Sequence, residues 1–459
     1  MLKPWGEETN VRKPENEVHK LDDYSLSRVP EHDRRHWFGI ATMRFGQMSA
    51  LSQFLLGATL GFGMRFWTAF WALTLGAVIL EIVSIFVGIA GMKEGLSTTM
   101  LVRWGGFGRL GSVLVSVVIA ISLIGWFGVQ NQVFADGLNQ LLGGPVWLWS
   151  IVTGLLVTVI VVYGFLSMGY TAYIAVPLFM VVAFISIGKA LSHQSLGHLI
   201  AMGAPGHVLS LAAGASIVAG GFIIGAIISP DMTRYNRSVT DVVKQTVLGI
   251  TLGEYLIGLI GVLLAHAVKS GNVITIVMST SGVIGTVVLV TATIKINDWN
   301  LYSSSLGIVN LFDVVFHKKI HRASVTILFG VLGTLLSVFG ILNHFIGFLT
   351  LLGVAVPPIG GILVVEYFFI RRYKSDLDSS RLSGALPSAY ESWNPVTLIA
   401  WVAAFLIGEF VHWGIPSLNS LVVSAVVYFI VSKAVNRRQI VTYGQVETRE
   451  WQAEVRESL

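Results

Sequence analysis

The chain has 459 residues, of which 54% are hydrophobic and only 12% are charged. Soluble proteins carry about a quarter charged residues, so this composition excludes an ordinary soluble protein. The net charge is only +5, and cysteine is absent, which excludes disulfides, thiolate metal sites and cysteine nucleophiles.

The N-terminal segment from Lys3 to Arg35 is polar and charged, so we do not expect a cleavable signal peptide. Twelve runs of about 20 mainly apolar residues follow, and each is long enough to cross the hydrocarbon core of a bilayer. Because backbone groups in lipid must be hydrogen-bonded internally, the sequence predicts an all-α polytopic membrane protein with twelve transmembrane helices. The predicted spans are 38–62, 66–91, 111–137, 146–165, 170–190, 207–229, 246–268, 282–312, 322–341, 345–370, 395–413 and 416–434.

Lysine and arginine are unevenly distributed over the loops that these spans define. On the side of the N-terminus lie 25 of the 30, whereas the opposite loops hold only Arg65, Lys189 and Lys269. Cytoplasmic loops are enriched in Lys and Arg, so we expect a multi-pass protein of the inner (plasma) membrane with both termini in the cytoplasm. The basic residues then face the lipid bilayer, and we expect no nucleic-acid partner.

Two spans contain glycines and polar residues that favour interrupted helices. The first includes Gln53 and Gly57, and the sixth includes Gly220, Gly221 and Gly225. Such segments at corresponding positions of two halves predict unwound helices that line a central transport site. The alternative is that these glycines only allow close helix packing.

Several charged residues are predicted to lie inside the membrane, where ionisable groups usually mark transport paths. Lys295 and Asp298 lie near the centre of the eighth span, three residues apart on one helical face. The alternative for this pair is an ion pair that fixes packing. Glu254 lies about 12 Å from the cytoplasmic end of the seventh span, which suits a proton carrier. Arg44, about two turns into the first span, is interpreted as snorkelling to the surface.

Trp126 is near the middle of the third span, away from the interfaces where tryptophan usually collects. Gln130, Asn131 and Gln132 follow in the same span, which favours a cavity over a lipid-facing ring. The sequence contains no Walker A loop, metalloprotease motif or nucleophile elbow, and we expect no cofactor and no enzymatic activity. A secondary transporter, a channel and an unrecognised membrane enzyme remain as alternatives.

At this level of detail the sequence resembles the nucleobase-cation-symport-1 family, and within it the bacterial cytosine and purine permeases. The resemblance covers roughly 400 residues, and the order and spacing of several blocks carry it. The first block is 125–128 in the third span, and the second is 221–223 in the sixth span, followed by Asp231, Arg234 and Tyr235. The third block is 297–298 in the eighth span, followed by Leu301, Tyr302 and Gly307. The fourth block runs along the tenth span and consists of 347–350, 357–361, 366–367 and 371–372.

The resemblance implies a five-plus-five inverted-repeat fold like that of the leucine-transporter group, with two further C-terminal helices. The implied segments are a cytoplasmic N-terminal segment (1–37), two five-helix repeats (38–190 and 207–370), two additional transmembrane helices (395–434) and a cytoplasmic tail (435–459). It also implies that a small planar heterocycle lies between Trp126 and Phe222. Unwound backbone at the three glycines of the sixth span, with Gln53, Gln130 and Asn297, would contact its edge.

Two departures from the family pattern affect the expected substrate and the expected coupling ion. Ala292 stands where the cytosine permeases offer an asparagine to the base, so base recognition must differ. Lys295 stands where sodium-coupled relatives place sodium ligands, and a buried ammonium group can exchange a proton. The sequence therefore predicts a permease that imports a nucleobase of the purine or cytosine type, coupled to protons rather than sodium through Lys295, Asp298 and Glu254. A hydantoin, allantoin or hydroxymethylpyrimidine permease is the alternative within the family.

Overall fold

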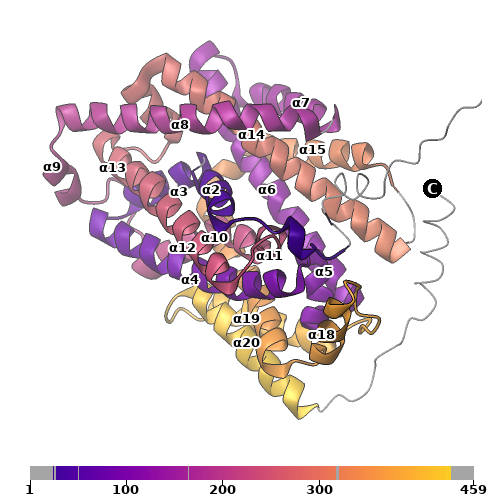
Figure 1. Cartoon of the computed structure of the whole chain (residues 1–459). Helices are drawn as coiled ribbons and strands as arrows, with labels where there is room; N and C mark the ends of the chain where they lie inside the picture. Colours follow the sequence, from indigo (N-terminus) through magenta and orange to yellow (C-terminus); the bar gives the residue numbers. More distant parts are fainter. Residues whose placement is uncertain (1–23, 25–26, 50, 164, 317–319, 436–459) are drawn as a thin grey trace, which may run out of the picture.

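The computed structural model describes Tyr24 and residues 27–49, 51–163, 165–316 and 320–435. Helices account for the architecture, and one isolated β-bridge joins Arg35 and Asn236. The helices pack side by side in a single bundle, with α19 and α20 against one side of it (Figure 1). The predicted all-α class is confirmed.

Each predicted span coincides with one helix or with consecutive helices. Six helical segments are long and apolar enough to cross a membrane, and six shorter apolar helices accompany them, which is consistent with twelve spans. In chain order, the helices at the predicted spans are α2 (Trp37–Met48) with α3 (Leu51–Gly63), α4 (Phe66–Glu94), α6 (Gly108–Leu142), α7 (Val146–Tyr163), α8 (Phe165–His193), α10 (Leu211–Ile227), α12 (Val239–Gly253) with η3 (Glu254–Gly258) and α13 (Leu259–Val268), α14 (Val273–Phe316), α15 (Arg322–Val338), α16 (Phe345–Ala355) with α17 (Pro357–Val365) and η5 (Glu366–Ile370), α19 (Pro395–Phe410) and α20 (Pro416–Ala434).

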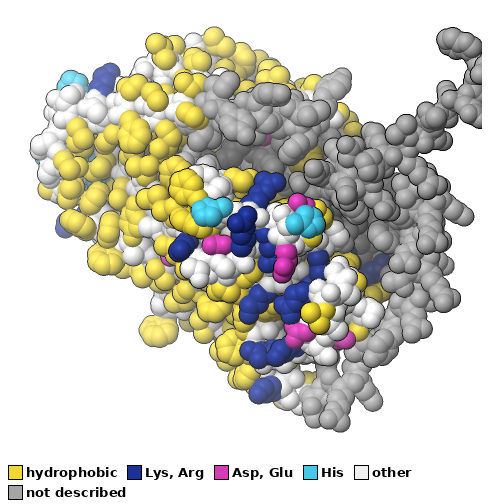
Figure 2. All heavy atoms as spheres, viewed as in Figure 1, with side chains coloured by type: hydrophobic (Ala, Val, Ile, Leu, Met, Phe, Trp, Pro, Cys, Tyr) yellow, Lys and Arg dark blue, Asp and Glu magenta, His cyan; other side chains and the backbone are white. Residues whose placement is uncertain are grey.

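Short helices connect some of these spans at one end of the bundle: α5 (Thr98–Val102), α11 (Ser229–Thr233) and α18 (Lys374–Leu382). Charged side chains gather over these three elements, whereas hydrophobic side chains dominate toward the left of the same view (Figure 2). Large apolar side chains such as Trp67, Ile121 and Phe184 are exposed on the long helices. An outer surface of this kind suits contact with lipid rather than water.

The first span is interrupted, as predicted, because α2 ends at Met48 and Ser49 leaves the helical conformation (φ −81°, ψ 53°). The tenth span is also divided, although the sequence analysis did not predict it. There α16 ends before Pro357 and Pro358, which begin α17. Proline has no N–H to donate to the preceding turn, so the chain restarts its helix at this point.

The interruption predicted at Gly220, Gly221 and Gly225 is wrong. Helix α10 is continuous from Leu211 to Ile227, and the sixth span changes direction only at Ile228 (φ −82°, ψ 13°). Glycine in a helix costs about 1 kcal/mol, which is less than leaving backbone groups without partners in lipid. The three glycines therefore remain helical. Gly220 and Gly221 allow close packing against α16 and α3, whereas Gly225 lies under the Phe222 ring of its own helix.

Candidate functional site

Helices α3, α10 and α16 meet at the centre of the bundle, where glycines allow close contact. A Cβ atom at Gly220 of α10 would lie 1.8 Å from the carbonyl oxygen of Leu349 in α16, and one at Gly353 would lie 2.6 Å from that of Ser216. A Cβ atom at Gly221 would lie 2.4 Å from the Leu56 side chain of α3. No larger residue fits at Gly220 or Gly353 without moving a helix, whereas at Gly221 only the Leu56 side chain has to move.

Trp126 lies on α6 beside this junction and is only 5% exposed. Its ring meets the rings of Phe345 and Phe348 edge-on, with centroids 5.9 and 5.6 Å apart. Phe348 is the neighbour of Leu349 in α16, so consecutive residues of one helix contact Trp126 and Gly220. Trp126 therefore faces the interior of the bundle, and the lipid-facing alternative is excluded.

Phe222 is half-buried on α10, and its ring covers Gly225 on the next turn, where an added Cβ would lie 2.4 Å from the ring. Among the described residues, no ring contact joins Phe222 to Trp126. The two aromatic residues thus come from helices that both pack against α16, without touching each other.

Two buried amide side chains near Trp126 have oxygens without hydrogen-bond partners among the described residues. Gln130 is one turn further along α6, and its Oε1 has no partner. Asn297 of α14 donates from Nδ2 to the carbonyl oxygen of Phe127 at 3.2 Å, while its Oδ1 has no partner. Buried polar atoms are rarely left in this state. Two such acceptors beside the turn of α6 that follows Trp126 suit a ligand that carries N–H donors.

The other polar side chains of this stretch form hydrogen bonds with neighbouring elements of the protein. Asn131 donates to the carbonyl oxygen of Ser150 and accepts from Thr153, both at 2.8 Å. Gln132 accepts from the backbone N–H of Leu342 at 2.8 Å. These two side chains hold α6 to its neighbours.

Gln53, which was predicted to contact the substrate, also contacts a predicted coupling residue. Its Nε2 donates to Glu254 Oε2 at 2.5 Å, across the contact between α3 and η3. The structure therefore joins a predicted substrate residue to a predicted coupling residue, and nothing in the sequence spacing indicated this.

Asp298 is buried on α14, next to Asn297. Lys295 belongs to the same helix, but its side chain lies outside the described residues, so its predicted pairing with Asp298 stays a prediction. The interpretation of Arg44 as a snorkelling residue is wrong. Arg44 is 1% exposed and donates to Ser229 Oγ at 2.7 Å, because the stem packs inward against Gly249.

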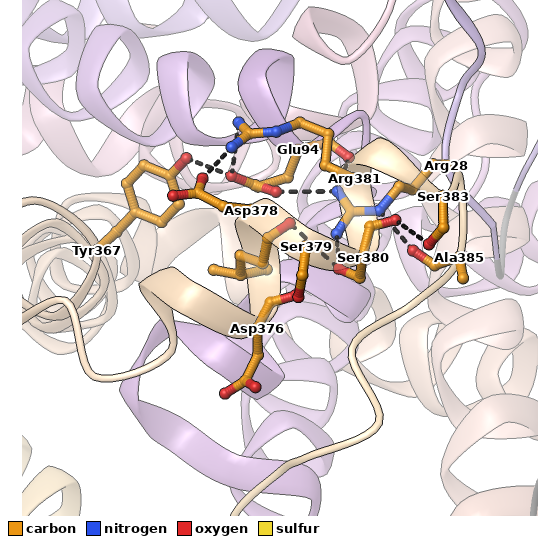
Figure 3. Close-up of polar contacts among 11 residues, drawn as sticks. Arg28, Glu94, Tyr367, Asp376, Asp378, Ser379, Ser380, Arg381, Ser383 and Ala385 are labelled. Carbon is orange, nitrogen blue, oxygen red and sulfur yellow. Dashed lines mark hydrogen bonds and ion pairs between the residues drawn. The ribbon is translucent and has the colours of Figure 1, made fainter.

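A polar network at the charged end of the bundle was not predicted (Figure 3). Glu94, at the end of α4, accepts from Arg28 at 2.9 Å, from Tyr367 at 2.6 Å and from Arg381 of α18 at 3.4 Å. Arg28 also donates to Ser380 and to the carbonyl oxygen of Ala385. A cavity of about 330 Å³ adjoins Glu94, Tyr367 and Arg381. The network ties the N-terminal segment, α4 and α18 together.

A second set of contacts at this end surrounds α11. Asp231 accepts from the backbone N–H of Thr98 at 2.8 Å, and Thr233 donates to the carbonyl oxygen of Gly88 at 2.8 Å. Burial raises the pKa of Asp231, while Arg234 and the Thr98 N–H oppose that rise. These contacts fix α11 against α5 and α4, at the point where the sixth span changes direction.

These observations define a polytopic helical membrane protein in which Trp126 and two amide oxygens without described partners lie buried inside the bundle. A protein-family profile described as "Permease for cytosine/purines, uracil, thiamine, allantoin" matches residues 28–432. The chain belongs to this family.

Two relatives are similar to this chain in sequence, and two solved structures are similar to it in fold. The cytosine permease of Escherichia coli (strain K12) is 27% identical over 431 residues, which cover 93% of this chain and 98% of the relative. The hydantoin permease of Microbacterium maritypicum is 25% identical over 412 residues, which cover 83% of this chain and 82% of that relative. The inward-facing conformation of Mhp1 is similar with a TM-score of 0.77 and 19% identity, covering 93% of this chain and 96% of that one. A second structure is that of Mhp1, a nucleobase-cation-symport-1 family transporter, in a closed conformation with bromovinylhydantoin bound. Its TM-score is 0.74 and its sequence identity is 20%, and the match covers 93% of this chain and 98% of that one. The predicted leucine-transporter-like fold is thereby confirmed.

Proposed function

We propose that this protein is a secondary active transporter, not an enzyme, which imports a nucleobase or a related planar heterocycle by alternating access. Family membership across residues 28–432 gives the class of protein. The observation that carries the substrate class is the buried Trp126 with two unpartnered amide oxygens near it. A flat ring can stack on the indole, while its N–H groups donate to Gln130 and Asn297.

A channel is the alternative of another class. A channel needs a continuous polar path, whereas glycine-mediated contacts close the centre of this bundle between α3, α10 and α16. Helix breaks at Ser49 and before Pro357 provide places where helices can change angle. These features favour a carrier that opens to one side at a time.

The relatives bind two kinds of ring, since one is named a cytosine permease and another a hydantoin permease. Both kinds of ring are planar and carry N–H and C=O groups. Ala292 is half-buried on α14 and offers no hydrogen bond from its side chain. We assign the contact between that helix and the ring to Asn297, because it is held beside Phe127 of α6. Purines, cytosine, hydantoin, allantoin and hydroxymethylpyrimidine are the substrates to compare.

Uptake by the purified protein in liposomes tests the proposed function. We expect saturable uptake of one of these heterocycles, and faster uptake when the same compound is loaded inside, as a carrier requires. Flux that does not saturate and shows no counterflow would indicate a channel. Failure to move any member of the panel would contradict the substrate class.

Trp126→Ala is expected to weaken binding of that substrate by at least about 30-fold, or ~2 kcal/mol, because both apolar burial and stacking are lost. Trp401→Ala is the matched control, since Trp401 of α19 is similarly buried but packs against Phe107. Binding measured by isothermal calorimetry should fall only in the first variant. Equal losses in both would mean general destabilisation, and unchanged affinity in Trp126→Ala would exclude the stacking role.

We also propose that a proton, rather than sodium, drives import, with Lys295 in the place of the coupling cation and Asp298 as its neighbour one turn on. Lys295→Ala should then keep part of the substrate binding but lose accumulation against a gradient. Lys189→Ala, at an exposed position on α8, should accumulate normally. If Lys295 were only structural, its loss would lower expression and binding together. Uptake that requires sodium and ignores a collapsed proton gradient would refute proton coupling.

The proposed orientation places both termini in the cytoplasm of the cell that carries this protein in its inner membrane. The two five-helix repeats, 38–190 and 207–370, would then have opposite orientations. Because the chain lacks cysteine, a single cysteine at the exposed Ser375 in α18 can be labelled without background. We expect an impermeant maleimide to label it only after the cells are opened. Labelling in intact cells would reverse the topology.

A further inference from the structure

Glu254 is a fully buried carboxyl group at the start of η3, a π-helical turn between α12 and α13. One oxygen accepts a 2.5 Å hydrogen bond from Gln53 Nε2, and the other oxygen has no hydrogen-bond partner in the described part of the chain. π-Helical turns within α-helices occur frequently at functional sites. The arrangement combines a buried ionisable group, a single neutral donor and an oxygen that no described group satisfies.

The surroundings of Glu254 contain no described cation that pairs with it. Helices α3, α4, α12 and α13 pack against η3. The titratable groups that they and η3 place near it are Glu81, held by Thr251, and Tyr255, whose hydroxyl lies 2.6 Å from Thr74. His266 of α13 binds two carbonyl oxygens instead. Arg44 packs against α12 at Gly249 but donates to Ser229.

The carboxyl group of Glu254 costs free energy in this place while it is ionised. Desolvation of an unpaired ion costs several kcal/mol, and the nearby Glu81 adds repulsion when it is ionised. One N–H donor from Gln53 compensates only part of this. A proton on the free oxygen removes the charge and occupies the atom that lacks a partner.

Gln53 lies on α3, the helix that packs against both η3 and α10. It lies in the first turn of α3, immediately after the break in the first span. Three residues later on the same helix, Leu56 fills the space beside Gly221 of α10. A change in what Gln53 binds therefore occurs on the helix that forms one wall of the site.

We propose that Glu254 is a proton-binding site and that Gln53 transmits its protonation state to the substrate. This inference rests on the proposed function. When Glu254 is ionised, its oxygen holds the Gln53 N–H. When a proton from water forms an O–H bond on Glu254, the carboxyl group holds that N–H less strongly, so Gln53 can donate to a substrate carbonyl. The same O–H bond breaks on the opposite side of the membrane and returns the proton to water.

Linkage makes the relation reciprocal: proton binding strengthens substrate binding, and substrate binding strengthens proton binding. If one proton is taken up per substrate, the substrate Kd changes by up to about tenfold per pH unit. A purely structural contact, which only holds α3 against η3, would produce no such dependence. The two roles are therefore separable by measurement.

Infrared difference spectroscopy of the purified protein tests the proton site without any ligand. We expect a carbonyl band of a buried carboxylic acid that titrates with pH and is absent from Glu254→Gln, whose amide can still accept from Gln53. Glu81→Gln is the matched control and should keep the band. Gln53→Leu should move its midpoint to higher pH by about one to two units, because a hydrogen bond to the charged form is lost.

Substrate binding then tests whether Gln53 transmits the protonation state of Glu254 to the substrate. With cytosine and hydantoin as probes, wild type and Glu81→Gln should show an affinity that falls as pH rises, whereas Glu254→Gln should show none of this dependence. A pH-dependent affinity that survives in Glu254→Gln, or an acid band that Glu254→Gln retains, would overturn the inference. If neither probe binds wild type, the proposed substrate class fails, while the infrared titration still decides whether Glu254 binds a proton.

Discussion

The close contact between α10 and α16 is the constraint on which the candidate site depends. Gly220 and Gly353 let two backbones approach until only hydrogen atoms fit between them. That approach fixes Leu349, and with it the neighbouring Phe348 that lies edge-on to Trp126. In a membrane, where lipid is as apolar as a leucine side chain, such contacts between small residues supply much of the packing energy. The aromatic wall of the site is therefore a consequence of glycine placement.

Hydropathy predicted the fold well because the bilayer allows few structures. Runs of apolar residues must be helices, and each of the twelve predicted spans coincides with helices of the structure. The glycines of the sixth span were misinterpreted because composition does not distinguish a glycine that breaks a helix from one that lets another backbone approach. Pro357 and Pro358 were the clearer signal of a break, since proline removes a hydrogen bond whatever its surroundings.

The site was predictable only in part. Trp126 was identified by its position in mid-span, and the unpartnered oxygens of Gln130 and Asn297 support its assignment. The contact of Gln53 with Glu254 could not be predicted, because it joins residues 201 positions apart through a helix crossing that sequence spacing does not reveal. The network around Glu94 has the same origin, since the three partners of Glu94 come from three separate segments. Long-range polar contacts become visible only when the fold is known.

A structure determined with the transported heterocycle bound tests the central claim most directly. The account predicts density for a flat ring stacked on Trp126, within hydrogen-bond distance of Gln130 and Asn297, with Phe222 on its other face. Density in the cavity beside Glu94 and Tyr367, with the Trp126 ring still covered only by Phe345 and Phe348, would contradict it.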